Sequence, residues 1–314
     1  MLNRICYLEG SFYTCMKNNT SRRKALKNIL VGSAALSAAP SMLLAHDRPF
    51  TEQKNTALKN NIHHSACYWC YGSIPLEKFC ADIKKIGLTA IDLLKADEWD
   101  TAKKYGLEVT MCYGGDLGIP NGWNDPQHHD TMLKNYTESI PLAAKYGYKN
   151  IICFSGNRNG MDDETGLKNC TEGLKKLMPV AEKYKINIVM ELLNSKVDHH
   201  DYMCDHTAWG VELCKRVGSG NFKLLYDIYH MQIMEGDVIH TIRDYHEYIA
   251  HYHTGGVPGR REIDNTQELY YPAVMKAILE TGYQGHVAQE FIPTPKDEAG
   301  KIASLEKCVK ICDV

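Results

Sequence analysis

Acidic and histidine side chains stand at the ends of four successive strand-like segments in the second half of this sequence. Three carboxylates and one imidazole form an oxygen-rich ligand set, which suits Mn²⁺, Mg²⁺ or Co²⁺ and is also compatible with Zn²⁺. Without a cation, three converging carboxylates would repel one another strongly. The residue types therefore predict a site for one divalent metal ion, on condition that the fold brings them together. They are Glu191, Asp227, His253 and Glu290.

Each of these residues is a weak signal on its own. A lone histidine in a strand is more often a hydrogen-bonded core residue than a ligand, and a single strand-end glutamate is as often ion-paired as functional. The joint pattern carries the prediction, because neighbouring parallel strands lie only about 4.8 Å apart. Four consecutive strand ends can therefore deliver their side chains to one point.

The elements that must position these residues alternate between short β-rich runs and longer amphipathic stretches, from residue 61 to the C-terminus. Several amphipathic stretches end at a glycine just before the next run, as helices commonly do. These glycines are Gly87, Gly106, Gly147 and Gly282. We predict eight strands, each followed by helix, over residues 62–68, 89–94, 108–113, 150–154, 187–192, 222–226, 249–253 and 286–291.

Eight strand-helix units in roughly 250 residues favour a closed α/β barrel, a single (β/α)8 TIM barrel. An open doubly wound sheet is the alternative, and it would ordinarily carry a glycine-rich phosphate loop after its first strand. The segment 63–67 reads His-His-Ser-Ala-Cys and is not such a loop. In a barrel the chemistry lies where the strands end, which is where the four candidate ligands stand.

The composition fits one large domain without a strong excess of positive or negative charge. The chain has 314 residues, of which 44% are hydrophobic, enough for one core but few for two domains. Lys and Arg total 36 against 38 acidic residues, a formal net charge of −2, which argues against a nucleic-acid partner.

The 12 cysteines are scattered through apolar runs, which favours buried thiols. Cys67 and Cys70 have redox-motif spacing without its usual context, so a disulfide or two free thiols are the alternatives.

Residues 1–45 have the pattern of an export leader. Arg22 and Arg23 precede an apolar, small-residue run over 29–45, which is typical of a twin-arginine signal. Ala25 stands where that signal usually has phenylalanine, so a Sec-type signal is the alternative, and Met16 is an alternative start. The interrupted apolar run is too short for a stable membrane span. We expect a periplasmic protein whose mature barrel domain covers residues 46–314.

The segment 226–236 reads Tyr-Asp-Ile-Tyr-His-Met-Gln-Ile-Met-Glu-Gly and resembles the signature of the hydroxypyruvate isomerase family, within the xylose isomerase-like barrels. Glu191 and Glu290 fall where that family has two glutamates. The resemblance implies that these glutamates are the acid/base pair and that His230 and Arg260 bind substrate oxygens. It also implies a homo-oligomer and a single divalent cation, held by Glu191, Asp227, His253 and Glu290.

The implied activity is a metal-dependent aldose-ketose isomerisation of a small hydroxy-carbonyl compound through an enediol. Such a reaction removes a proton beside a carbonyl and returns one elsewhere, which a carboxylate on each face of the substrate can do. A divalent cation at the substrate oxygens stabilises the enediolate. The sequence departs from the family at His253, where hydroxypyruvate isomerases have glutamine and related ketose epimerases have histidine.

That departure and the export signal leave a second substrate class open. It comprises larger keto-sugars, inositol derivatives and 3-keto-glycosides, which would be epimerised or isomerised by the same chemistry. A metal-dependent hydrolase such as a nuclease would need more histidine ligands and a basic face, which the charge balance does not supply. A non-catalytic sugar-binding protein would not require both Glu191 and Glu290.

Several further residues near predicted strand ends have two interpretations each. Arg260 lies in the glycine- and proline-rich loop 255–261, which suits a turn that covers the substrate, although a solvated arginine is the alternative. His64, in the first strand, either contacts substrate or packs. Trp69 and Trp123 either form an aromatic pocket wall or pack within their loops.

Overall fold

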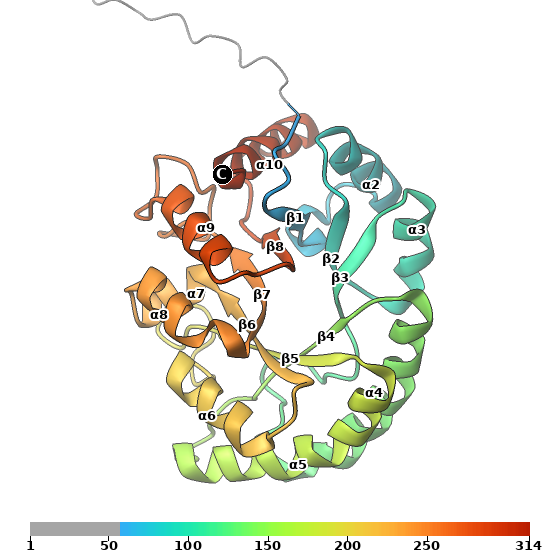
Figure 1. Cartoon of the computed structure of the whole chain (residues 1–314), viewed down its shortest axis with the longest axis vertical. Helices are drawn as coiled ribbons and strands as arrows, with labels where there is room; N and C mark the ends of the chain where they lie inside the picture. The colour runs from blue at the N-terminus through green and yellow to red at the C-terminus, as the bar shows by residue number, and fades with distance from the viewer. Residues whose placement is uncertain (1–56) are drawn as a thin grey trace, which may run out of the picture. The chain divides into compact units, whose positions relative to one another are not determined.

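Eight parallel strands form a barrel in the computed structural model of this protein, which describes residues 57–314 (Figure 1). The strands are neighbours in the order β1-β8-β7-β6-β5-β4-β3-β2. Between β1 and β2 the described residues form one isolated bridge, which joins Cys67 to Asp92. The predicted single (β/α)8 TIM barrel is thus confirmed. Its strands are β1 (His63–Ala66), β2 (Ala90–Leu94), β3 (Glu108–Cys112), β4 (Asn150–Cys153), β5 (Asn187–Glu191), β6 (Phe222–Asp227), β7 (Ile249–Thr254) and β8 (His286–Gln289).

Helices follow each strand and surround the strands on the outside (Figure 1). Short 3-10 turns, at Tyr68–Tyr71, Ala96–Glu98 and His246–Tyr248, complete the connections. The helices are α2 (Leu76–Lys85), α3 (Trp99–Lys104), α4 (Pro126–Tyr146), α5 (Asp163–Tyr184), α6 (Thr207–Val217), α7 (Ile228–Met234), α8 (Val238–Tyr245), α9 (Tyr271–Glu280) and α10 (Glu298–Cys312).

The local sequence explains why these elements form. In β5 the run Ile-Val-Met-Glu is buried throughout, as expected for a parallel strand covered on both faces. Helix α4 begins after Asp125, whose side chain accepts a hydrogen bond from the backbone N–H of Gln127, and it ends at Gly147 in the left-handed region, with a φ of 83°. The glycines predicted to end helices all have positive φ.

The predicted strand boundaries agree with the structure to within one or two residues. The largest differences are at β1 and β8, where the predicted ranges run past the last ladder residue into the following loop. The export leader predicted over 1–45 lies outside the described residues. Within residues 57–314, no helix combines the length and the apolar character needed to cross a membrane.

Candidate metal centre and active site

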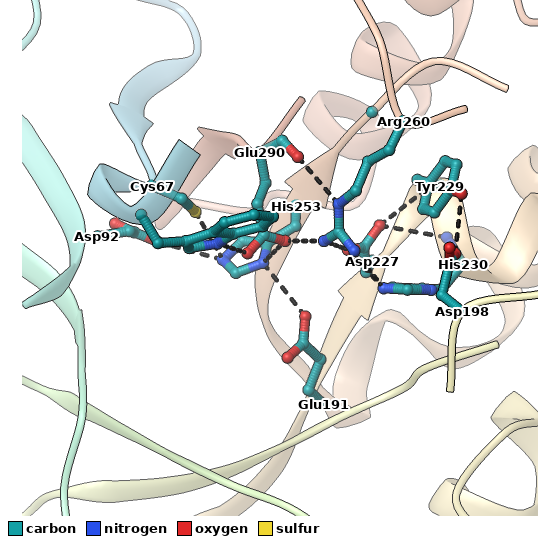
Figure 2. A network of polar contacts seen from close by, with 12 residues as sticks. Cys67, Asp92, Glu191, Asp198, Asp227, Tyr229, His230, His253, Arg260 and Glu290 are labelled. Atoms are coloured by element: carbon teal, nitrogen blue, oxygen red, sulfur yellow. Dashed lines mark hydrogen bonds and ion pairs between the residues drawn. The ribbon is translucent and has the colours of Figure 1, made fainter. Parts of the chain in front are cut away.

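The four candidate ligands meet at the carboxyl ends of the strands. Glu191 is the last residue of β5, Asp227 is the last of β6, His253 lies in β7 and Glu290 directly follows β8. Each offers a ligand atom, and these atoms all lie within 4.8 Å of one another at buried positions. Figure 2 shows their side chains, which approach one another from neighbouring strands. The barrel therefore produces the convergence that the sequence pattern requires.

The geometry of this cluster fits a cation. His253 Nδ1 lies 3.4 Å from Glu191 Oε1 and 2.7 Å from Glu290 Oε2. Nevertheless His253 Nδ1 and Glu191 Oε1 have no hydrogen-bond partner among residues 57–314. Buried polar atoms are rarely left without a partner, and these two face a set of carboxylates. One divalent cation would satisfy both atoms and neutralise the crowded acidic groups.

Burial and mutual repulsion separate the acidities of the three carboxyl groups. Burial raises the pKa of Glu191, and the nearby Glu290 raises it further. Burial also raises the pKa of Asp227 to about 8, against an opposing effect of Arg260. Burial acts on Glu290 in the same direction, but His253 and Arg260 hold the pKa of that carboxyl well below its ordinary value. Such crowding is costly without a compensating positive charge.

Arg260 supplies positive charge beside the cluster. Its Nη2 donates to Asp227 Oδ2 at 2.9 Å and also to Glu290 Oε2, while its Nε donates to the Glu290 carbonyl oxygen at 3.1 Å. The guanidinium lies between two rings, 5.4 Å from the centroid of Trp69 and 5.1 Å from that of Tyr229. Its backbone has a φ of +55°, a strained conformation of the kind found at functional sites. The loop thus holds Arg260 in the site.

His230 is held in one orientation by the start of α7 and by the loop after β5. Asp227 Oδ1 accepts hydrogen bonds from the backbone N–H groups of Tyr229 (2.8 Å) and His230 (3.3 Å). The backbone N–H of Asn194 lies 3.1 Å from His230 Nδ1, and Arg260 Nη1 lies 2.8 Å from His230 Nε2. Both of these groups can only donate, so the two contacts hold the ring in place without assigning its proton to either nitrogen. Burial and Arg260 hold the pKa of His230 well below its ordinary value.

A pocket of about 280 Å³ opens beside the cluster. Glu191, Glu290 and Arg260 line one side of it. The rest of the lining is largely apolar; it comprises Trp69, Leu93, Tyr113, Ile119, Ile152, Phe154, Leu193 and His199. A substrate can therefore contact the charged groups and an apolar wall at the same time.

The two tryptophans have different positions. Trp69 is 43% exposed, lines the pocket, and donates from Nε1 to Glu290 Oε1 at 2.7 Å. Trp123 is fully buried and packs against the rings of His129 and Tyr136. The interpretation of Trp123 as a pocket wall is wrong, because its loop folds inward over α4 instead of facing the mouth.

The prediction that His64 contacts substrate is also wrong. Strand β1 begins at His63, so His64 lies near the amino end of the strand, whereas the ligands lie at the carboxyl ends. Its Nε2 is 4.0 Å from Asp313 Oδ1, just beyond α10, and it lines a separate hollow with Glu108 and His286. Burial lowers the pKa of His64 to about 4. Cys67 and Cys70 are free thiols.

Sequence reasoning missed Asp92, the fully buried aspartate of β2. Its carboxylate accepts hydrogen bonds from Thr110 Oγ1, from His251 Nε2 at 2.5 Å and from His253 Nε2 at 3.3 Å. The signal was available, because Asp92 interrupts the apolar run Ala-Ile-Asp-Leu-Leu just as Glu191 interrupts its own strand. The sequence analysis also gave no role to Asn194, whose backbone N–H lies 3.1 Å from His230 Nδ1.

Known proteins resemble this chain in both sequence and fold. Hydroxypyruvate isomerase of Escherichia coli (strain K12) is 30% identical over 179 residues, which cover 56% of this chain and 67% of that enzyme. The structure of D-psicose 3-epimerase with D-tagatose from Clostridium cellulolyticum H10 has a TM-score of 0.67 at 18% identity, covering 80% of this chain and 98% of that one. The IOLI protein, solved with a zinc atom, has a TM-score of 0.61 at 14% identity, covering 80% and 95%.

A family model, described as the xylose isomerase-like TIM barrel, also matches this chain. The match covers residues 80–308, from α2 to α10. This range includes the four candidate ligands, Arg260 and His230. Strands β2 to β8 and the strand-end cluster lie in the same range. The chain therefore belongs to the xylose isomerase-like TIM barrel family.

Proposed function

We propose that this protein is a metal-dependent sugar isomerase or epimerase that transfers protons beside a carbonyl through an enediol. The observation that carries the proposal is the convergence of Glu191, Asp227, His253 and Glu290 on one buried point that opens to a pocket. Support also comes from relatives: the Escherichia coli protein is named an isomerase, and a neighbour in fold is named an epimerase.

The four residues would hold one Mn²⁺, Mg²⁺, Co²⁺ or Zn²⁺ ion, since three carboxylates and one imidazole suit any of these. When bound, the cation would supply positive charge to substrate oxygens and favour the enediolate. A neighbour in fold was solved with zinc, which is consistent with this ligand set.

Glu191 and Glu290 both line the pocket and are the proposed proton carriers. One carboxylate takes the proton from the carbon beside the carbonyl, and the electron pair of that C–H bond moves toward the carbonyl oxygen. Isomerisation results when a proton returns to the former carbonyl carbon and the proton of the neighbouring hydroxyl moves to the former carbonyl oxygen, so that the hydroxyl-bearing carbon becomes the new carbonyl. Epimerisation results when a proton returns to the opposite face of the first carbon. Two carboxylates on different strands allow either outcome.

His230 and Arg260 are the proposed contacts of the substrate oxygens. The His230 ring is fully buried and held between the Asn194 backbone and Arg260 Nη1. The Arg260 guanidinium is held between Trp69 and Tyr229 and keeps its charge. Donors that are already oriented stabilise a developing oxyanion without reorganising during the reaction.

One observation favours a larger keto-sugar, inositol derivative or keto-glycoside over hydroxypyruvate. His253 is present where the resemblance gives hydroxypyruvate isomerases glutamine and ketose epimerases histidine. We therefore propose epimerisation or isomerisation of a larger substrate as the second, better-fitting candidate beside hydroxypyruvate isomerisation.

Proton-exchange NMR in D₂O tests both candidates together. Metal-loaded protein is mixed with short hydroxy-aldehydes, hydroxypyruvate, ketohexoses and 3-keto-glycosides, and deuterium is followed at the carbon beside each carbonyl. We expect incorporation that stops after exhaustive chelation and returns when metal is added back. Incorporation that survives chelation in still-folded protein would exclude the metal. Absence of exchange with every compound would favour a binding protein or a hydrolase.

We also propose that the protein is exported to the periplasm through its twin-arginine signal. The support is the sequence of residues 21–45. Cell fractionation of the wild type and of a variant with both Arg22→Lys and Arg23→Lys tests this. The wild type should be periplasmic and the variant should stay inside, whereas equal export of both would point to the Sec route.

A further inference from the structure

Strand β2 is distorted around Asp92, which lies next to the cluster of candidate metal ligands. Its pairing with β3 shifts register between Ile91 and Asp92 and again between Asp92 and Leu94. Between these shifts Leu93 has a φ of +59°, a conformation that leucine rarely adopts. Bulges of this kind re-aim side chains and are frequent near active sites. Here Leu93 lines the pocket, and Asp92 reaches into the barrel below it.

The Asp92 carboxylate is fully buried and held from two sides. Thr110 donates to Oδ1, whereas Oδ2 is shared by His251 and His253. His251 and His253 lie on the same face of β7, with their rings 5.2 Å apart and nearly perpendicular. Both contacts of Asp92 with β7 are therefore to histidine rings, and they hold the rings of His251 and His253 in their orientations.

The two nitrogens of His253 face different neighbours. Nε2 lies 3.3 Å from Asp92 Oδ2 and 3.7 Å from Cys67 Sγ, and the carboxylate is the stronger acceptor of the two. Nδ1 faces Glu191 and Glu290 and has no hydrogen-bond partner among the described residues. A histidine ligates a metal through the nitrogen that carries no proton, and the partner of the other nitrogen selects which one that is.

We propose that Asp92 is a positioning residue for the metal centre: it holds the proton of His253 on Nε2 and thereby directs the Nδ1 lone pair to the point shared with Glu191, Asp227 and Glu290. This inference rests on the proposed metal-dependent function. Strand β2 contributes none of the four ligands. Its distortion nevertheless places Asp92 where it can orient one of them, His253.

Zinc binding tests the role, because Zn²⁺ is diamagnetic and suits the ligand set. Its affinity is measured by calorimetry for the wild type, Asp92→Asn and, as a matched control, Asp205→Asn. Asp205 is a buried carboxylate with its own partners, Ser195 and His206, and it contacts none of the four ligands. We expect Asp92→Asn to weaken zinc binding about 10- to 100-fold and Asp205→Asn to leave it at the wild-type value.

NMR of ¹⁵N-histidine-labelled, zinc-loaded wild-type protein provides a readout that does not depend on the variant folding. We expect the His253 proton on Nε2 and the zinc-induced ¹⁵N shift on Nδ1, and we expect this pattern to change in Asp92→Asn. A proton on Nδ1 in the wild type, or wild-type affinity and spectra in folded Asp92→Asn, would overturn the inference. Absence of zinc binding by the wild type would instead overturn the metal-dependent function on which it rests.

Discussion

The two walls of the pocket are built from opposite kinds of residue. The wall formed by the ends of β5 to β8 carries the acidic residues, His253 and the neighbouring Arg260, all linked by short polar contacts (Figure 2). The wall formed by β2 to β4 and their loops is mainly apolar, with Leu93, Ile119 and Phe154 among its members. These groups of strands lie on opposite sides of the barrel (Figure 1).

This difference indicates that the two walls have different functions. Charged groups that converge can bind a cation and transfer protons, whereas apolar groups can only fit the shape of a substrate. Substitutions in the charged wall should therefore reduce the chemical step, and those in the apolar wall should change substrate binding. The predictions below test that division, from the largest effect to the smallest.

Glu290→Gln should have the largest effect. The amide keeps the shape of the side chain but cannot take up a proton, and a general acid/base step contributes about 10²- to 10⁴-fold in rate. We expect turnover in the D₂O exchange assay to fall by that factor in folded protein. Glu212→Gln, on the surface of α6 beside Arg216, is the control and should keep wild-type turnover. Retention of more than about a tenth of wild-type turnover by Glu290→Gln would contradict the role.

Arg260→Lys should have the next largest effect. Lysine keeps the charge but loses the planar group that contacts Asp227, Glu290 and the two aromatic rings. Loss of one or two charge-assisted hydrogen bonds should lower kcat/KM about 10- to 100-fold. Arg261→Lys is the matched control, because the Arg261 side chain is exposed and its hydrogen bond among the described residues goes to the Ile292 carbonyl. Equal losses in both variants would indicate a general effect on the loop.

Ile119→Ala tests the apolar wall. Ile119 is partly buried and lines the pocket, so truncation removes methylene and methyl contacts with the substrate. We expect KM to rise about 3- to 10-fold with little change in kcat. Ile302→Ala, on α10 and outside the pocket lining, should leave both constants unchanged. A fall in kcat without a change in KM would mean that the apolar wall takes part in the chemistry.

Asp264→Asn should have the smallest effect, on stability alone. Asp264 lies in the loop that carries Arg260, and its bond with Lys307 of α10 lowers the pKa of its carboxyl to about 2. Because the folded pKa lies below the unfolded value of about 3.9, the stabilisation is present above that value and disappears as the pH falls toward 2. For this exposed pair we expect about 0.2–1 kcal/mol at pH 7.

Urea unfolding of the wild type and Asp264→Asn at several pH values measures this difference. The two free energies of unfolding should converge as the pH decreases from 4 to 2. A difference that stayed constant over this range would mean that the ion pair is not its cause.

The sequence predicts the barrel and the convergence of the four candidate ligands, because both depend on local patterns. Apolar runs mark the strands, and a charged residue at the end of such a run marks the mouth, as at Glu191 and Asp227. Asp92 also interrupts an apolar run, but the contacts of its carboxylate could not be predicted, since they depend on a bulge in β2 and on residues of β7, more than 150 residues away. Trp123 and His64 were misplaced because the direction of a loop and the end of a strand depend on tertiary packing.

The seam between β1 and β2 has a consequence for the lifetime of a bound ion. The described residues join these strands through the single bridge between Cys67 and Asp92, so local opening should require less free energy there than between β4 and β5, which pair over four residues. Both bridge residues also contact His253. An ion held by the four ligands would therefore lose an orienting contact whenever the seam opens. The rate at which the ion exchanges with solution would then be set by how often β1 and β2 separate. If these strands separate rarely, the protein would keep its metal ion when it is diluted.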